Sequence, residues 1–130
     1  MQQNRFDVVG VGNAIVDVIS NVDDDLFSAP AVTLEVPFDA VITAASVRCY
    51  KPGAAIFHAA LAALGVEAGR ALFVGDRLHE DVGGAGAVGM TTVQALWFHA
   101  DDVPGGPEPA HRAFTAMDVL NLVRRLNGDR

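Results

Sequence analysis

Apolar residues along this chain gather into short continuous runs rather than alternating strictly with polar residues. The strand-like runs are FDAVITA at 38–44, ALFVG at 71–75 and TTVQALW at 91–97. Between the first two, KPGAAIFHAALAALG at 51–65 starts with a lysine–proline pair and ends at a glycine, as many helices do. Unalternated strands interleaved with helices are typical of a parallel sheet that is covered on both faces. The pattern therefore predicts an α/β domain.

Two helices are predicted from apolar residues that recur three or four positions apart, and a third from a glycine-rich stretch at 81–88. The first helix lies within 51–65, and the last follows a turn-rich segment at 99–112. Their expected buried residues are Ile56, Phe57, Ala60, Leu61 and Leu64 in the first helix, and Val119, Leu122, Val123 and Leu126 in the last.

The N-terminal part has a different character. Two β-branched runs, at 6–11 and 14–22, are separated by Gly12 and Asn13, which suit a tight turn and predict a hairpin. An acidic, proline-containing junction follows. We expect one domain, 1–130, made of an N-terminal strand segment at 1–27, a junction at 28–37 and a C-terminal half at 38–130.

Composition and charge narrow the classes of partner. The 130 residues are 51% hydrophobic and 19% charged, without an apolar run of the roughly 20 residues that span a bilayer. A formal charge of −7 repels nucleic-acid backbones and anionic membranes, so neither is expected as a partner. Cys49 is the only cysteine, and the first residues lack the pattern of a secretory signal, so a cytoplasmic location is expected.

Two aspartates follow the run at 71–75. Asp76 comes directly after it, and Asp81 falls in the first turn of the next helix. Ligands of open parallel sheets bind at the carboxyl ends of the strands, and two carboxylates with room for water suit Mg²⁺. The alternative is that Asp81 caps the helix and Asp76 is an ordinary turn residue.

The segment 38–93 closely resembles the C-terminal half of haloacid dehalogenase-like (HAD) hydrolases, and the resemblance extends to about 126. It is carried by FDAVIT, by Lys51 with Pro52, by AIFHAALAALGV and by VGDRLHEDVGGAGAVGM. The resemblance implies a three-layer, Rossmann-like, mostly parallel sheet, here truncated and without a cap domain. It also implies that Lys51 neutralises phosphate, and that Asp76 and Asp81 form the acidic metal site, with Asp76 the first choice as ligand.

The chain departs from that family at the nucleophile. HAD hydrolases carry a D-x-D-G-T pattern after their first strand, whereas the N-terminal strand here has Gly10 and Gly12 at the two aspartate positions. Glycine cannot act as a nucleophile or as a general acid. The residues between 21 and 37 are also too few for the family's strand that ends in a phosphate-binding serine or threonine. An aspartyl mechanism is therefore not expected. Weaker candidates for additional chemistry are Asp23 with Asp25, and His79 with Glu80.

Residues of about 5–27 resemble the opening of ribokinase-like, particularly adenosine-kinase-like, kinases. The shared G-N-x-x-x-D pattern implies that Asp17, with Asn13 nearby, binds sugar hydroxyls. The nucleotide-binding half of such kinases is absent, so kinase activity is not expected. We interpret the chain as a chimera of the two families. An incomplete sheet exposes strand edges, which predicts a homodimer.

The leading hypothesis is a metal-dependent phosphoester hydrolase, of phosphatase or phosphodiesterase type, that acts on a small phosphorylated substrate. Its catalytic residues are Lys51, Asp76 and Asp81, with Lys51 also binding substrate and metal-activated water replacing the aspartyl nucleophile. Mg²⁺ is the expected cation, with Mn²⁺ or Zn²⁺ as alternatives. Two other hypotheses remain open: a non-catalytic dimeric Rossmann-like protein, and a nucleoside-binding module that uses Asn13 and Asp17.

Overall fold

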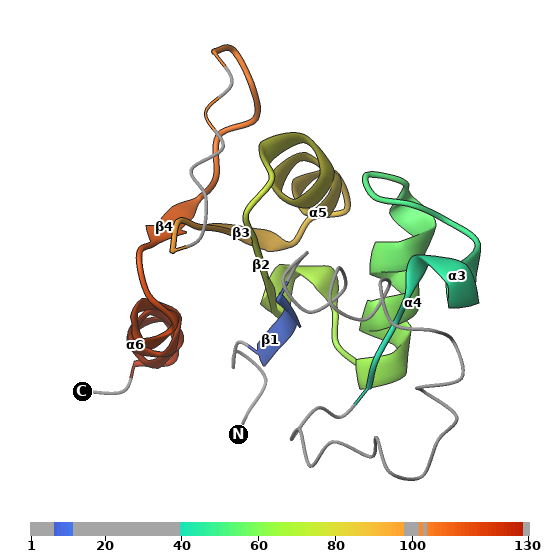
Figure 1. The fold of residues 1–130 in the computed structure, drawn as a ribbon. Coiled ribbons are helices and arrows are strands. Elements are labelled where there is room, and N and C mark those ends of the chain that lie inside the picture. The colour runs from blue at the N-terminus through green and yellow to red at the C-terminus, as the bar shows by residue number, and fades with distance from the viewer. Residues whose placement is uncertain (1–6, 12–39, 98–101, 103, 129–130) are drawn as a thin grey trace, which may run out of the picture.

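Four strands form one parallel sheet in the computed structural model, which describes residues 7–11, 40–97, 102 and 104–128 (Figure 1). The strands lie in the order β1 (Asp7–Val11), β2 (Ala71–Gly75), β3 (Thr91–Ala95) and β4 (His111–Ala113). All three pairings are parallel. This confirms the predicted parallel sheet, and it places the carboxyl ends of the four strands at one edge.

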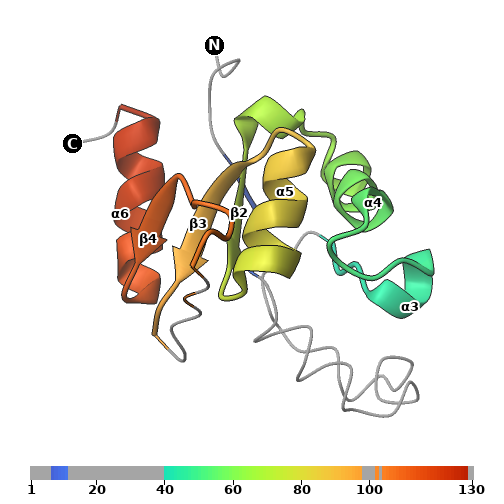
Figure 2. The same cartoon turned by 90° about the horizontal axis from the view of Figure 1, so that it is seen from above.

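Helices cover both faces of the sheet, so the molecule has the three layers that were expected (Figures 1 and 2). On one face lie α4 (Ala54–Leu64) and α5 (Gly84–Ala87), and on the other lies α6 (Ala116–Leu126). The remaining helical segments are α3 (Ala44–Val47), a 3₁₀ turn η2 (Ala68–Arg70) and a π-helical segment η3 (Leu78–Gly83) that runs directly into α5. None of the helices described is long and apolar enough to span a bilayer.

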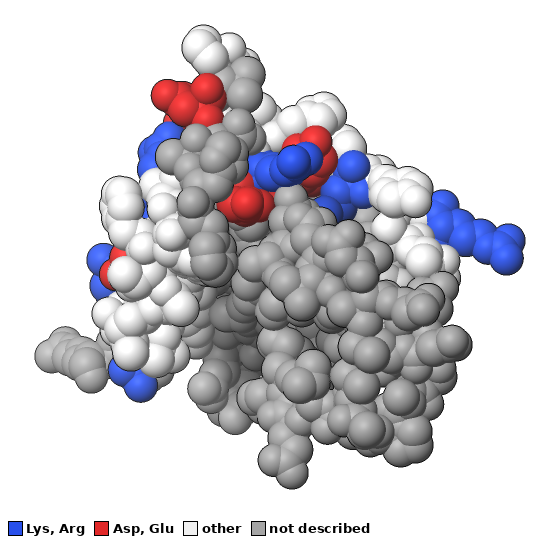
Figure 3. Space-filling view, in the orientation of Figure 1, with Lys and Arg blue, Asp and Glu red and all other residues white. Residues whose placement is uncertain are grey.

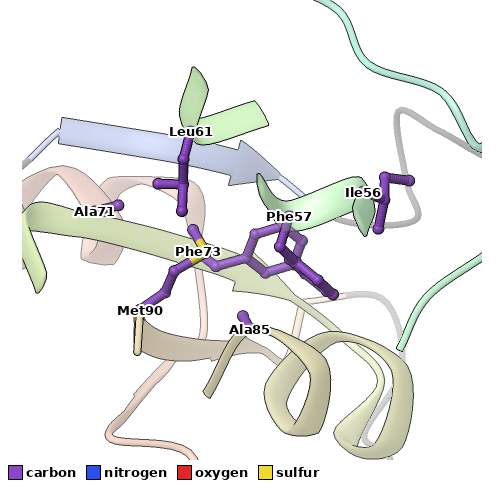
Figure 4. Close-up of a cluster of buried hydrophobic side chains, with 7 residues drawn as sticks. All are labelled: Ile56, Phe57, Leu61, Ala71, Phe73, Ala85 and Met90. Atoms are coloured by element: carbon purple, nitrogen blue, oxygen red, sulfur yellow. The ribbon is translucent and has the colours of Figure 1, made fainter. Parts of the chain in front are cut away.

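β2 is buried along its whole length because its alternate side chains enter two separate cores. Ala71 and Phe73 face α4, where the rings of Phe57 and Phe73 meet edge to face with centroids 5.1 Å apart (Figure 4). Leu72 and Val74 face the opposite way. Their core also holds residues of β3, β4 and α6: Val93, Ala95, Ala113, Val119 and Leu122.

The two long helices end where their sequences indicate. α4 ends at Gly65, whose φ of 64° is a left-handed conformation that glycine adopts without strain. α6 starts with a capping box, in which Thr115 and Asp118 each accept a hydrogen bond from the other's backbone N–H. Of the residues expected to be buried in these helices, Ile56, Phe57, Leu61, Val119 and Leu122 are buried, and Ala60, Leu64, Val123 and Leu126 are half-buried.

The strand predicted at 38–44 is wrong over its described part. Residues 40–43 are not in a strand, and Thr43 instead caps α3 by accepting a hydrogen bond from Ser46 N at 3.1 Å. Val41 is 51% exposed, which an interior strand would not allow. The reason is local: the threonine and the serine three residues later form a capping box, and this starts a helix within the apolar run.

Two further differences concern element boundaries. The helix predicted at 81–88 starts earlier, because η3 already begins at Leu78. The segment at 99–112, expected to be only turns, ends in β4, which starts at His111 and pairs with β3. Of the predicted hairpin, β1 is present and pairs in parallel with β2, while the second run and the junction lie outside the described residues.

Candidate active site

The candidate site lies at the carboxyl edge of the sheet, where Asp76 follows β2 and η3 begins two residues later. β1 ends at the same edge, since Val11 pairs with Val74. Gly75 is required here because a Cβ at this position would collide with the carboxylate of Asp81. The absence of a side chain at Gly75 therefore lets Asp81 fold back over the end of β2.

Lys51 and Asp81 form a buried ion pair across the site. The Lys51 Nζ lies 2.5 Å from Asp81 Oδ1, and the two side chains are 12% and 0% exposed. Lys51 precedes α4, so the pair joins the segment before α4 to η3. The Nζ also lies 5.9 Å from the ring centroid of Phe73, close enough for a cation–π contribution. The lysine is thus held at the sheet edge by a charge on one side and a ring on the other.

The second oxygen of Asp81 is also used. Asp81 Oδ2 accepts a hydrogen bond from Arg77 N at 3.1 Å, which satisfies a backbone donor at the start of η3. Burial raises the pKa of the Asp81 carboxyl above its ordinary value, and the nearby charge of Asp76 acts in the same direction. The Lys51 ammonium opposes this rise. The aspartate therefore acts as the anchor of Lys51 and of the loop that follows β2.

Asp76 presents the atom most suited to a cation. Its Oδ1 is buried and has no hydrogen-bond partner among the residues that the structure describes. A buried carboxylate oxygen without a partner is costly, so native proteins normally supply a donor, water or metal ion. Within the described ranges, no three His, Cys, Asp or Glu side chains converge as metal ligands. A site built on Asp76 therefore fits Mg²⁺, which uses one or two carboxylates and otherwise keeps its waters.

The structure brings Lys51, Asp76 and Asp81 to one place, although Lys51 lies 25 residues before Asp76 and 30 before Asp81 in the sequence. Asn13, Asp17, Asp23 and Asp25 lie outside the described residues.

His79 is exposed, and Glu80 Oε1 lies 3.6 Å from Nη1 of Arg77, the residue before η3, so neither is directed to a buried ligand site. Sequence reasoning missed Phe73 and Gly75. The G-D pair after a buried strand was the available signal for Gly75, whereas nothing in the sequence marks Phe73 as more than core.

Comparison with known proteins gives matches over this same part of the chain. A family model described as HAD-hydrolase-like matches residues 48–96. A glyceraldehyde 3-phosphate phosphatase from Methanopyrus kandleri is 40% identical over 95 residues, which are 71% of this chain and 41% of that protein. Another from Pyrococcus abyssi is 48% identical over 61 residues, 47% of this chain and 24% of that protein. The chain thus spans less than half the length of these relatives.

Among solved structures, a HAD phosphatase from Thermococcus onnurineus superposes with a TM-score of 0.57 and 38% sequence identity, covering 72% of this chain and 40% of that one. These matches do not support the resemblance of residues 5–27 to ribokinase-like kinases, of which only Asp7–Val11 is described here. The matches and the buried lysine–aspartate pair beside Asp76 agree on one conclusion. The part of this chain that these proteins match is similar to the corresponding part of HAD-like hydrolases.

Proposed function

We propose that this protein is a metal-dependent phosphoester hydrolase that works at the carboxyl edge of β2. The observation that carries the proposal is the buried Asp76 Oδ1, which has no hydrogen-bond partner among the described residues, beside the Lys51–Asp81 pair. A cation needs a carboxylate oxygen that can coordinate it, and a phosphate needs a fixed ammonium group to offset its charge. Because both relatives are named glyceraldehyde 3-phosphate phosphatases, a small phosphate monoester is the substrate class that we favour.

Each residue has a distinct role in this proposal. Asp76 holds a divalent cation, with Mg²⁺ first and Mn²⁺ or Zn²⁺ as alternatives, and Asp81 remains a candidate second ligand. When bound, such a cation neutralises charge on the phosphoryl oxygens and lowers the pKa of water. Lys51 faces the negative charge that grows in the transition state, and Asp81 fixes its position. The pair is preorganised, so little reorganisation is needed during the reaction.

Water is the proposed nucleophile. β1 occupies the position beside β2, with Gly10 paired to Phe73, and glycine offers no carboxylate there. In the reaction, the water oxygen bonds to phosphorus, the ester P–O bond breaks, and the alcohol leaves with a proton. The reaction therefore needs no covalent enzyme intermediate.

Phosphate release from 4-nitrophenyl phosphate, and 4-nitrophenol release from its bis ester, test this proposal and separate a phosphatase from a phosphodiesterase. Both are measured with Mg²⁺, Mn²⁺ or Zn²⁺ for the wild type and for Asp76→Asn. We expect the substitution to lower the metal-dependent rate at least about 10-fold, since an amide is a poorer cation ligand than a carboxylate.

Glu67→Gln is the matched control. Glu67 is an exposed acid before η2, next to the amino end of β2, so its neutralisation removes the same charge far from the site. We expect its rate to stay within about 2-fold of the wild type, as for most surface substitutions. Equal rates for the wild type and Asp76→Asn, with both proteins folded by thermal melting, would contradict the proposed site.

A further inference from the structure

A second feature of the carboxyl edge is a pocket of about 450 Å³ on the β3 side of Asp76. It is lined by residues from the start of η3, the ends of β3 and β4, and the segment 104–108. Gly75, which precedes Asp76, pairs with Gln94 of β3, and Gln94 pairs with Arg112 of β4. Gln94 and Arg112 both line the pocket, so the pocket and the candidate site share one edge of the sheet.

The segment 104–108 forms one wall of the pocket, and contacts with neighbouring elements hold this wall in place. Pro107 packs against η3 so closely that a Cβ at Gly83 would lie 3.2 Å from its Cγ. Two residues after this segment, Ala110 N donates a hydrogen bond to the buried Thr92 Oγ1 at 3.0 Å. The wall is therefore fixed to the helix that follows Asp76 and to β3. A wall with such contacts suits a preformed binding site.

The lining is polar and slightly acidic. Gln94 is only 3% exposed and contributes a side-chain amide to the lining. At the rim, the Arg112 guanidinium lies 3.3 Å from the Glu108 carboxylate, so these two charges offset each other. Asp102 adds a further carboxylate, which leaves a net lining charge of −1. Figure 3 shows both acidic and basic side chains in the upper part of the view.

We propose that this pocket is the leaving-group subsite of the hydrolase, and that it takes a small, uncharged, hydroxyl-bearing alcohol. This proposal rests on the function proposed above. A side-chain amide both donates hydrogen bonds to hydroxyls and accepts them, and a carboxylate accepts them, whereas the net negative lining disfavours a second acidic group on the substrate. The volume is within the range of small-ligand sites.

Two esters that differ in one group test the subsite. Glycerol 3-phosphate releases a neutral triol, and 3-phosphoglycerate carries a carboxylate in place of one hydroxymethyl group. We expect the wild type to prefer the first by at least about 10-fold in kcat/KM, because a like charge meets the pocket lining. In the double variant Asp102→Asn with Glu108→Gln, the lining charge changes from −1 to +1, and the preference should shrink at least about 3-fold.

Glu67→Gln again provides the control, and its preference should equal that of the wild type. An unchanged preference in the double variant overturns the subsite while leaving the phosphatase proposal intact, since Asp76 and Lys51 are untouched.

Hydrolysis of 4-nitrophenyl phosphate but of neither ester would overturn the subsite alone. If 4-nitrophenyl phosphate is not hydrolysed either, the proposed function fails, and ligand binding then tests the pocket by itself. The side-chain amide resonances of Gln94 should then shift on titration with glycerol and remain unchanged with glycerate. The absence of a glycerol-dependent shift, or equal shifts with both compounds, would overturn the inference.

Discussion

Lys51 and Asp81 depend on each other because both lie in a mostly buried place. The Lys51 Nζ and Asp81 Oδ1 atoms are 2.5 Å apart, and Asp81 has no exposed surface. Each charged group has therefore lost most of its contact with water and is stabilised by the opposite charge of its partner. Asp81 also holds Arg77 N, so the pair stabilises the start of η3 as well as the position of the lysine. Removal of either partner therefore affects both stability and the candidate reaction.

We predict that Lys51→Met lowers the free energy of unfolding by about 3–5 kcal/mol at neutral pH, because it leaves the Asp81 carboxylate buried without its counter-charge. The measurement is urea unfolding in buffer that contains a chelator. The double variant Lys51→Met with Asp81→Asn should recover much of this loss, since no uncompensated charge remains.

The pH dependence of the same variant follows from the pKa of Asp81. Without Lys51, burial and the charge of Asp76 both raise that pKa, so the folded state binds a proton more readily than the unfolded state. The stabilising contribution of Asp81 in Lys51→Met should be greatest below the ordinary value of 3.8 and should be lost as the pH rises through the higher folded pKa. A deficit of equal size at acid and neutral pH would contradict this explanation.

At the level of elements, the short helix α5 packs closely on α4. This close packing requires a glycine at Gly84 of α5 but not at Gly86. A Cβ at Gly84 would lie 2.6 Å from Cε2 of Phe57 and 3.0 Å from Cα of Pro52. A Cβ at Gly86 would meet only Thr92 Cγ2, at 3.7 Å, which is an ordinary contact. The two glycines therefore provide a matched pair.

We predict that Gly84→Ala lowers the free energy of unfolding by about 1–3 kcal/mol, because the added methyl group overpacks the core next to Lys51. Gly86→Ala should be neutral or raise stability by up to about 1 kcal/mol, since alanine favours the helix. Chemical denaturation of both variants is the measurement, and an equal effect at the two positions would show that the close packing is absent.

The elements that sequence predicts well are those whose own residues decide their structure. The run at 71–75 is apolar along its length, and the run at 91–97 starts with three β-branched residues; both contain strands that are buried along most of their length. β4 was missed because its three residues start with His111 and Arg112, and only pairing with β3 makes them a strand. The described residues of the apolar run before Thr43 form no strand, because Thr43 and Ser46 form a capping box that starts α3.

The residues of the candidate site were predictable, but their geometry was not. The resemblance to HAD hydrolases implied a phosphate and cation site at Lys51, Asp76 and Asp81, and the structure brings these three residues together; their chemistry stays a prediction. Which oxygen of each aspartate is used depends on η3 folding back over Gly75, a tertiary contact that no local pattern contains. The pocket at Gln94 was not predictable for the same reason, since three separate segments form it.

For the whole molecule, the homodimer stays a prediction. β4 is the last strand of the described sheet, with β3 as its one strand partner among the described residues, and an open strand edge favours association. We expect sedimentation velocity to give twice the chain mass of 13.6 kDa at micromolar concentration. A mass of 13.6 kDa at every concentration would contradict it.

The central claim is that Asp76 holds a divalent cation at the carboxyl edge of β2, beside Lys51. Paramagnetic broadening by Mn²⁺ tests it directly, because amide resonances lose intensity only near the bound ion. We predict that substoichiometric Mn²⁺ broadens the amides of Gly75, Asp76 and Arg77 in the wild type, leaves those of α6 sharp, and has no such effect in Asp76→Asn. Uniform broadening, or the same broadening in both proteins, would contradict the claim.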